Sequence, residues 1–119
     1  MFSKAFPYEE QIWNIQDEQG FRSRIIAYTP ELLLMEWHFF NEGYVIPWHN
    51  HYHTQISYIV KGSAKVVFDD GSEKMCKAGE AVSFSPNENH SVVTMEPDTV
   101  IMDAFNPVRL DHIENHKKL

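Results

Sequence analysis

Apolar and polar residues alternate along short segments of this chain, and turn-forming residues separate the segments. Alternation with a period of two places successive side chains on opposite faces of a β-strand. One face of residues 32–40, for example, carries Leu33, Met35, Trp37 and Phe39. Many short strands with turns between them are typical of an all-β sandwich or barrel. The segments predicted as strands are 21–28, 32–40, 54–60, 63–68, 73–76, 81–84, 91–95 and 99–105.

The residues between these segments indicate how the strands are connected. Asp69-Asp70-Gly71-Ser72 predicts a hairpin turn, because Asp and Gly tolerate the positive φ values of such turns. Lys61-Gly62 predicts a tight connection between two strands. All the turns are short enough for antiparallel pairing of successive strands. A helical pattern occurs only in the tail, from Arg109 to Lys117.

Length and composition predict one soluble domain that spans residues 1–119. A chain of 119 residues with 43% apolar residues can bury a core, and no repeat or linker divides it. Cys76 is the single cysteine, which suits a reducing compartment. The N-terminus lacks a secretory signal, and the most apolar run, residues 32–35, is too short to span a bilayer. We therefore expect a cytoplasmic protein with no membrane partner.

The charge balance narrows the possible partners. The formal net charge is −7 and the pI is about 5.4. Such a chain repels phosphate backbones, and no basic stripe interrupts the acidic pattern, so nucleic acid is not an expected partner. An anionic ligand needs a local positive charge instead, from a metal ion or from Arg22, Arg24 or Arg109.

Three of the seven histidines lie within five residues, which indicates a metal site. His49, His51 and His53 alternate, and Gln55 follows two residues later. In an extended strand, side chains two residues apart point to the same face, so His49, His51 and Gln55 can converge. Imidazole is a common ligand of transition metals, whereas buried histidines without partners are costly. These residue types and this spacing predict one divalent transition metal ion, with nickel, iron, manganese, cobalt and zinc all compatible.

The same segment resembles the first signature of the cupin superfamily, whose members are small antiparallel jelly-roll β-barrels. That signature covers residues 43–62 and reads Gly43-x5-His49-x-His51-x3-Gln55-x6-Gly62, with Gln55 in place of the usual Glu. The second signature covers residues 79–94, where the glycine and the histidine match and the others depart: Gly79-x5-Ser85-x-Asn87-x2-His90-x3-Thr94. The resemblance implies that His90 is the fourth ligand, with His49, His51 and Gln55, and that His53 is not a ligand.

A further segment resembles a narrower family, the small KdgF-type cupins of pectin and alginate degradation. Residues 102–111, MDAFNPVRLD, are similar to the closing segment of those proteins. The resemblance implies a metal site with three His and one Gln, and it assigns Asp103, Phe105 and Arg109 to the active site. It also implies the activity, which is conversion of 4,5-unsaturated monouronates to their linear keto form. The substrate would be a small anionic sugar acid.

The chemistry of that reaction is consistent with these residue types. A Gln amide can coordinate a metal through its oxygen, but it cannot act as a carboxylate base, so proton transfer falls to another group. Asp103 shares a predicted strand face with Phe105, and a carboxyl group in an apolar barrel can be tuned toward proton transfer. The planar guanidinium of Arg109 suits a substrate carboxylate.

Other interpretations stay open at this stage. A metal-dependent dioxygenase and a non-catalytic cupin that binds a sugar acid are the alternative functions. Asp103 could be structural, and Arg109 could be a surface cation near a helix start. His112 and His116 are spaced i, i+4 in the tail, and we expect a solvated terminus there. We also expect a homodimer, in which strands of residues 21–40 pair across a two-fold axis.

Overall fold

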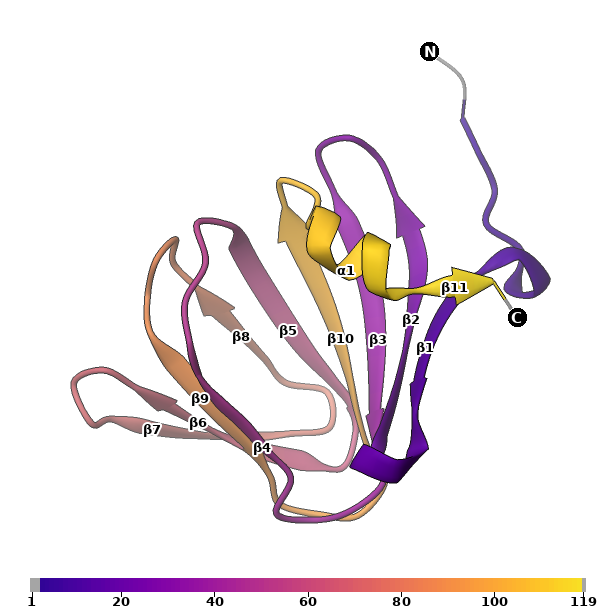
Figure 1. The fold of residues 1–119 in the computed structure, drawn as a ribbon. Helices are drawn as coiled ribbons and strands as arrows, with labels where there is room; N and C mark the ends of the chain where they lie inside the picture. Colours follow the sequence, from indigo (N-terminus) through magenta and orange to yellow (C-terminus); the bar gives the residue numbers. More distant parts are fainter. Residues whose placement is uncertain (1–2, 119) are drawn as a thin grey trace.

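Two antiparallel β-sheets form the two layers of the structure (Figure 1), a computed structural model that describes residues 3–118. The first sheet has seven strands in the order β11 (Lys117–Lys118), β1 (Ile12–Gln16), β2 (Phe21–Tyr28), β3 (Leu33–Phe39), β10 (Thr99–Asn106), β5 (Thr54–Lys61) and β8 (Ala81–Phe84). The second has four strands in the order β4 (Val45–His49), β9 (His90–Thr94), β6 (Ser63–Phe68) and β7 (Glu73–Lys77). The helical segments are the 3₁₀ turns η1 (Tyr8–Glu10) and η2 (Asp17–Gln19) and the α-helix α1 (Leu110–Asn115).

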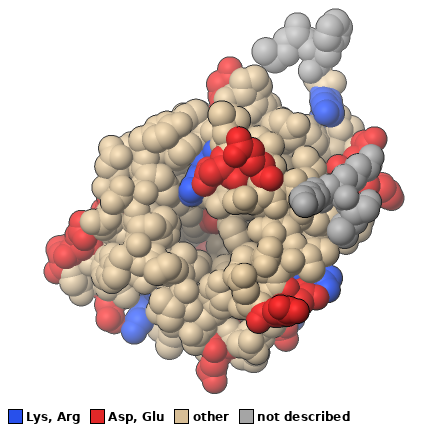
Figure 2. Space-filling model, viewed as in Figure 1, with Lys and Arg blue, Asp and Glu red and all other residues tan. Residues whose placement is uncertain are grey.

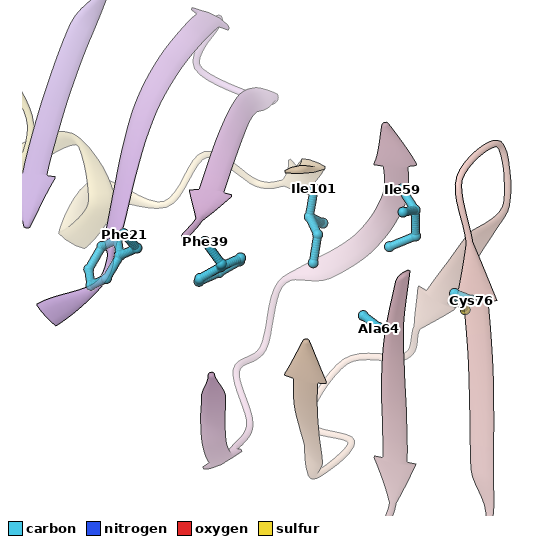
Figure 3. Close-up of a cluster of buried hydrophobic side chains, with 6 residues drawn as sticks. All are labelled: Phe21, Phe39, Ile59, Ala64, Cys76 and Ile101. Atoms are coloured by element: carbon cyan, nitrogen blue, oxygen red, sulfur yellow. The ribbon is translucent and has the colours of Figure 1, made fainter. Parts of the chain in front are cut away.

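The core lies between the two sheets, because the alternation of each strand turns its apolar side chains toward the opposite layer. Figure 3 shows this for six buried residues that come from both sheets and face a common interior: Phe21, Phe39, Ile59, Ala64, Cys76 and Ile101. The same alternation buries polar residues on β5 and β10. Gln55 and Ser57 precede Ile59 on the inner face of β5, and Asp103 follows Ile101 on the inner face of β10.

The predicted strands are all present, and the all-β class with a short C-terminal helix is confirmed. Three strands were not predicted, namely β1, β4 and β11. β4 was missed because it contains Pro47, which lacks a backbone N–H and is rare inside strands. The structure places β4 at the edge of the second sheet, where a missing donor costs no hydrogen bond to a neighbouring strand.

The expectation that successive strands pair holds for only part of the chain. The hairpin at Asp69–Ser72 joins β6 to β7 as predicted, and its turn is closed by a hydrogen bond from Phe68 N to Ser72 O of 2.9 Å. The connection at Lys61-Gly62 is tight, but β5 and β6 belong to different sheets and do not pair. Short connections therefore carry the chain between the layers as well as within one layer.

The C-terminal tail is not a solvated terminus, which corrects the expectation for His112 and His116. His116 is buried, and its Nε2 lies 2.8 Å from Ser23 Oγ of β2. Val108 and Ile113, on either side of His112, pack against the core cluster that includes Phe105. Figure 1 shows α1 beside β10 and β3, followed by β11 next to β1. The tail therefore closes over one end of the first sheet.

Gly62 is where the chain crosses between the sheets, and substitution there should be far more destabilising than at a simple turn. Gly62 and Gly71 have nearly the same positive φ, 83° and 82°. A Cβ at Gly62 would lie 2.9 Å from Thr99 Cα, whereas a Cβ at Gly71 has no neighbour within 4 Å. We predict that Gly71→Ala lowers the free energy of unfolding by about 1–2 kcal/mol for the left-handed backbone alone.

Gly62→Ala should lower the free energy of unfolding by about 2 kcal/mol more than Gly71→Ala, because backbone must move to relieve the clash. Urea denaturation of both variants measures the difference. Equal losses would show that the Thr99 contact imposes no constraint.

Candidate functional site

Three histidines come together at one end of the cavity between the sheets. His49 ends β4, His90 begins β9, and the pairing of these strands places the two residues opposite each other. His51 lies in the loop that carries the chain from β4 to β5. One candidate ligand atom from each of the three histidines lies within 4.8 Å of the others. His49, His51 and Gln55 therefore do not share one strand, as the sequence analysis assumed, and they converge because the chain changes sheets between them.

The second nitrogen of each histidine fixes which atom faces the cluster. In all three rings Nδ1 lies within hydrogen-bond distance of a backbone carbonyl, which can only accept. Nδ1 therefore carries the proton, and Nε2 presents a lone pair, as in metal-binding histidines. The three contacts are His49 Nδ1 to Pro47 O at 2.8 Å, His51 Nδ1 to His53 O at 3.0 Å and His90 Nδ1 to Glu88 O at 2.8 Å.

Gln55 presents its oxygen to the histidines, because its nitrogen is engaged elsewhere. The Gln55 amide nitrogen donates to Ser57 Oγ at 2.9 Å and to Asp103 Oδ1 at 3.2 Å. Its Oε1 lies 2.9 Å from His51 Nε2. Both atoms of this close contact are acceptors, so a proton or a cation must lie between them. Burial lowers the pKa of His51, which disfavours a second proton on the ring, and a cation bound by both atoms is compatible with this contact.

The environment of His90 also favours a bound cation. Its Nε2 is buried and has no hydrogen-bond partner among residues 3–118. Burial also lowers the pKa of His90 to about 4, so the ring is neutral near pH 7. A buried lone pair without a donor is costly unless a metal ion satisfies it. The donor set of three imidazoles and one amide oxygen thus fits a divalent transition metal.

Asp103 lies directly behind the Gln55 amide. The register of β5 and β10 places Asp103 opposite Ser57, whose hydroxyl donates to Asp103 Oδ1. Burial raises the pKa of Asp103, while the hydrogen bonds from Ser57 and Gln55 act in the opposite direction. The indole of Trp37 acts in the same direction as these hydrogen bonds, although its geometry falls short of a hydrogen bond. The net shift is upward, the direction expected for a carboxyl group that takes part in proton transfer.

A cavity of about 360 Å³ opens beside these residues. Figure 2 shows this face of the molecule hollowed near its centre, with acidic and basic side chains at the rim. Most of the lining is apolar, and Arg109 is the only Lys or Arg among the lining residues. Its guanidinium lies 5.1 Å from the centre of the Phe105 ring, and its Nη2 is 2.7 Å from Asp111 Oδ2. Arg109 is therefore not a free surface cation, since its side chain is only 16% exposed.

The structure separates His53 from the cluster and adds His112 to the cavity. His53 is buried against Tyr52, with 4.0 Å between the ring centres, and it is not one of the three clustered histidines. His112 lines the cavity from α1, although the sequence analysis assigned it no role there. The signal that could have found it is the pair Val108 and Ile113, which are apolar on either side of His112 and anchor the tail.

The fold and the site define a double-sheet barrel with a histidine-lined cavity, and this architecture is that of a cupin. The chain belongs to the cupin family, since the profile of the cupin domain matches residues 36–104. The pectin degradation protein KdgF of Dickeya dadantii (strain 3937) is 33% identical over 94 residues, which cover 79% of this chain and 84% of that protein. The resemblance to KdgF-type cupins is thereby confirmed.

Solved structures agree with this assignment. The structure of KdgF from Halomonas sp. has a TM-score of 0.82 and 31% identity, and the match covers 93% of this chain and 99% of that one. An RmlC-like cupin from Shewanella frigidimarina NCIMB 400 has a TM-score of 0.78 and 29% identity, and the match covers 92% of this chain and 96% of that one. Within residues 3–118, no helix has the length and apolar character that a membrane span requires.

The partly buried His112 predicts that the free energy of unfolding depends on pH. Burial, aided by the charge of Arg109, lowers the pKa of His112 to about 4. As the pH falls below 6.5, the unfolded chain binds a proton at this residue and the folded chain does not, so the free energy of unfolding decreases. We predict that His112→Gln reduces this decrease between pH 6.5 and about 4, by up to about 1.4 kcal/mol per pH unit.

Urea denaturation of metal-free protein at several pH values in this range measures the effect. Parallel pH profiles for the wild type and His112→Gln would contradict the predicted burial of a neutral ring.

Proposed function

We propose that this protein is a metal-dependent enzyme that converts 4,5-unsaturated monouronates, products of pectin or alginate breakdown, to their linear keto form. The main support for the proposal is that Gln55 contacts both the histidine cluster and Asp103. Its oxygen faces His51, and its nitrogen binds the buried carboxylate of Asp103. A metal-binding group and a proton-transfer group are thus joined in one cavity. The similarity to proteins named for pectin degradation supports this reaction class.

His49, His51, His90 and Gln55 are the proposed ligands of one divalent transition metal ion. Nickel, iron, manganese, cobalt and zinc all accept imidazole and amide ligands, so its identity is open. When bound, the ion supplies Lewis acidity toward substrate oxygens. All four ligands are neutral, which leaves the charge of the ion available to an anionic substrate. A homodimer and a cytoplasmic location remain predictions.

Arg109 and Phe105 are proposed to hold the substrate. Asp111 engages Nε and Nη2 of Arg109, at 3.3 and 2.7 Å, while Nη1 makes no hydrogen bond with a described residue. Nη1 can therefore donate to the substrate carboxylate. Phe105 packs beneath the guanidinium and keeps its position. The cavity volume of about 360 Å³ lies near the lower end of ligand pockets, which suits a monosaccharide.

Asp103 is proposed to move the proton. In the reaction the hemiacetal hydroxyl loses a proton and becomes an aldehyde carbonyl as the bond from its carbon to the ring oxygen breaks. The ring oxygen is released as an enolate oxygen and becomes the keto carbonyl when the far carbon of the former double bond gains a proton. The sum of these steps is an isomerisation, so neither an oxidant nor a reductant is needed. Asp103 is the only carboxylate among the residues that line the cavity, and its raised pKa suits a group that accepts and returns a proton.

Loss of one proposed ligand should abolish tight metal binding. We predict that His90→Ala weakens the binding of Zn(II) or Ni(II) by at least about 100-fold, more than loss of a residue that only orients a ligand. His53→Ala is the matched control, because His53 is also a buried histidine near the site. It should bind metal within about threefold of the wild type. Competition with a chromophoric chelator measures the metal affinity of each variant. Equal affinities of the two variants would exclude this ligand set.

Removal of the Asp103 charge should abolish catalysis and keep the metal. We predict that Asp103→Asn lowers kcat at least about 100-fold, the usual contribution of a general acid or base. The Asn oxygen can still accept from Ser57 and Gln55, so the metal content should be unchanged. Asp98→Asn is the control, since Asp98 is exposed and contacts His38.

The assay follows the loss of unsaturated monouronate, released by a polysaccharide lyase, over its spontaneous rate. A wild-type rate equal to the spontaneous one would overturn the proposed function. Oxygen uptake by an Fe(II)-loaded sample would favour a dioxygenase instead.

A further inference from the structure

His112 occupies a position in the cavity for which the proposed chemistry has no use. Its ring lies edge-on to Trp37, with ring centres 5.5 Å apart, and beside Phe105 at 5.7 Å. Phe105 also contacts His51, at 5.8 Å between ring centres. One aromatic ring therefore lies next to both His51 of the histidine cluster and His112, so a ligand in the cavity beside Phe105 is within reach of both.

The backbone at His112 is anchored on both sides along the chain. On the N-terminal side, the Arg109 guanidinium packs on Phe105. On the C-terminal side, His116 contacts Ser23, and β11 pairs with β1 through Trp13 and Lys117. A side chain on a short helix fixed in this way holds its position without a ligand, which reduces the entropic cost of binding one.

The His112 ring brings polar atoms into an otherwise apolar wall. Its neighbours Trp37 and Phe105 are aromatic, and neither of its ring nitrogens forms a hydrogen bond with a described residue. Because burial lowers its pKa to about 4, the ring is neutral near pH 7 and carries one donor and one acceptor. A neutral imidazole suits a hydroxyl or carbonyl oxygen better than a carboxylate, and Arg109 is the group available for the carboxylate.

We propose that His112 is a specificity-determining residue that hydrogen-bonds a hydroxyl or carbonyl oxygen of the sugar acid while Arg109 binds its carboxylate. This inference rests on the proposed function for the identity of the ligand. It assigns the tail helix a direct part in substrate recognition. Arg109 and His112, from one short segment, would then fix the orientation of the substrate relative to the histidine cluster and Asp103.

The test compares His112→Phe with His112→Gln. Phe keeps the aromatic contacts with Trp37 and Phe105 and removes both nitrogens, whereas Gln keeps a donor and an acceptor. We expect KM for the unsaturated monouronate to rise about tenfold in His112→Phe, the effect of one lost hydrogen bond, and to stay within about threefold in His112→Gln. His38→Phe is the control, because His38 is exposed on β3 and contacts Asp98.

Binding of D-galacturonate, a saturated monouronate, to the metal-loaded protein gives a second readout by calorimetry. It should weaken about tenfold in His112→Phe, with metal content unchanged. If His112→Phe is unstable, His112→Leu removes the nitrogens with less bulk.

A rate above background in the wild type together with unchanged KM and affinity in these variants would overturn the role of His112 alone. Absence of catalysis with galacturonate binding that depends on His112 would overturn only the proposed reaction. Absence of binding by the wild type would overturn the inference.

Discussion

The contact between His51 Nε2 and Gln55 Oε1 is the constraint on which the rest of the site depends. Two acceptors lie 2.9 Å apart, and each is held there by its other hydrogen bonds. The His53 carbonyl fixes the tautomer of His51, and Asp103 with Ser57 fixes the amide of Gln55. A cation bound by both atoms would make this arrangement favourable. Besides its proposed role in proton transfer, the buried Asp103 orients the amide of Gln55, a proposed metal ligand.

The strands could be predicted from the sequence because alternation is a local property. The apolar face of residues 32–40 and the turn at Asp69–Ser72 contain all the information that those elements need. Pairing partners could not be predicted in this way. β5 pairs with β10 and β8 rather than with β6, because Gly62 turns the chain into the other sheet. At that turn Gly62 lies so close to Thr99, which is distant in the sequence, that a Cβ would clash with it.

The proposed site was only partly accessible from the sequence. The spacing of His49, His51 and Gln55 indicated a metal, but the reason given, a shared strand face, was wrong because the chain changes sheets after His49. Ser57 was overlooked, since a serine on a strand carries no signal until Asp103 is known to lie opposite. His112 was assigned to solvent because charged residues surround it in the sequence. Its place in the cavity lining depends on how Val108 and Ile113 pack against distant strands.

The most direct test of this account is a crystal structure of the metal-loaded protein with anomalous diffraction at the absorption edge of the metal. The account predicts one strong peak in contact with Nε2 of His49, His51 and His90 and with Oε1 of Gln55. The Gln55 nitrogen should still contact Asp103. A peak bound by other residues, or a Gln55 amide whose nitrogen faces the histidines, would contradict the account.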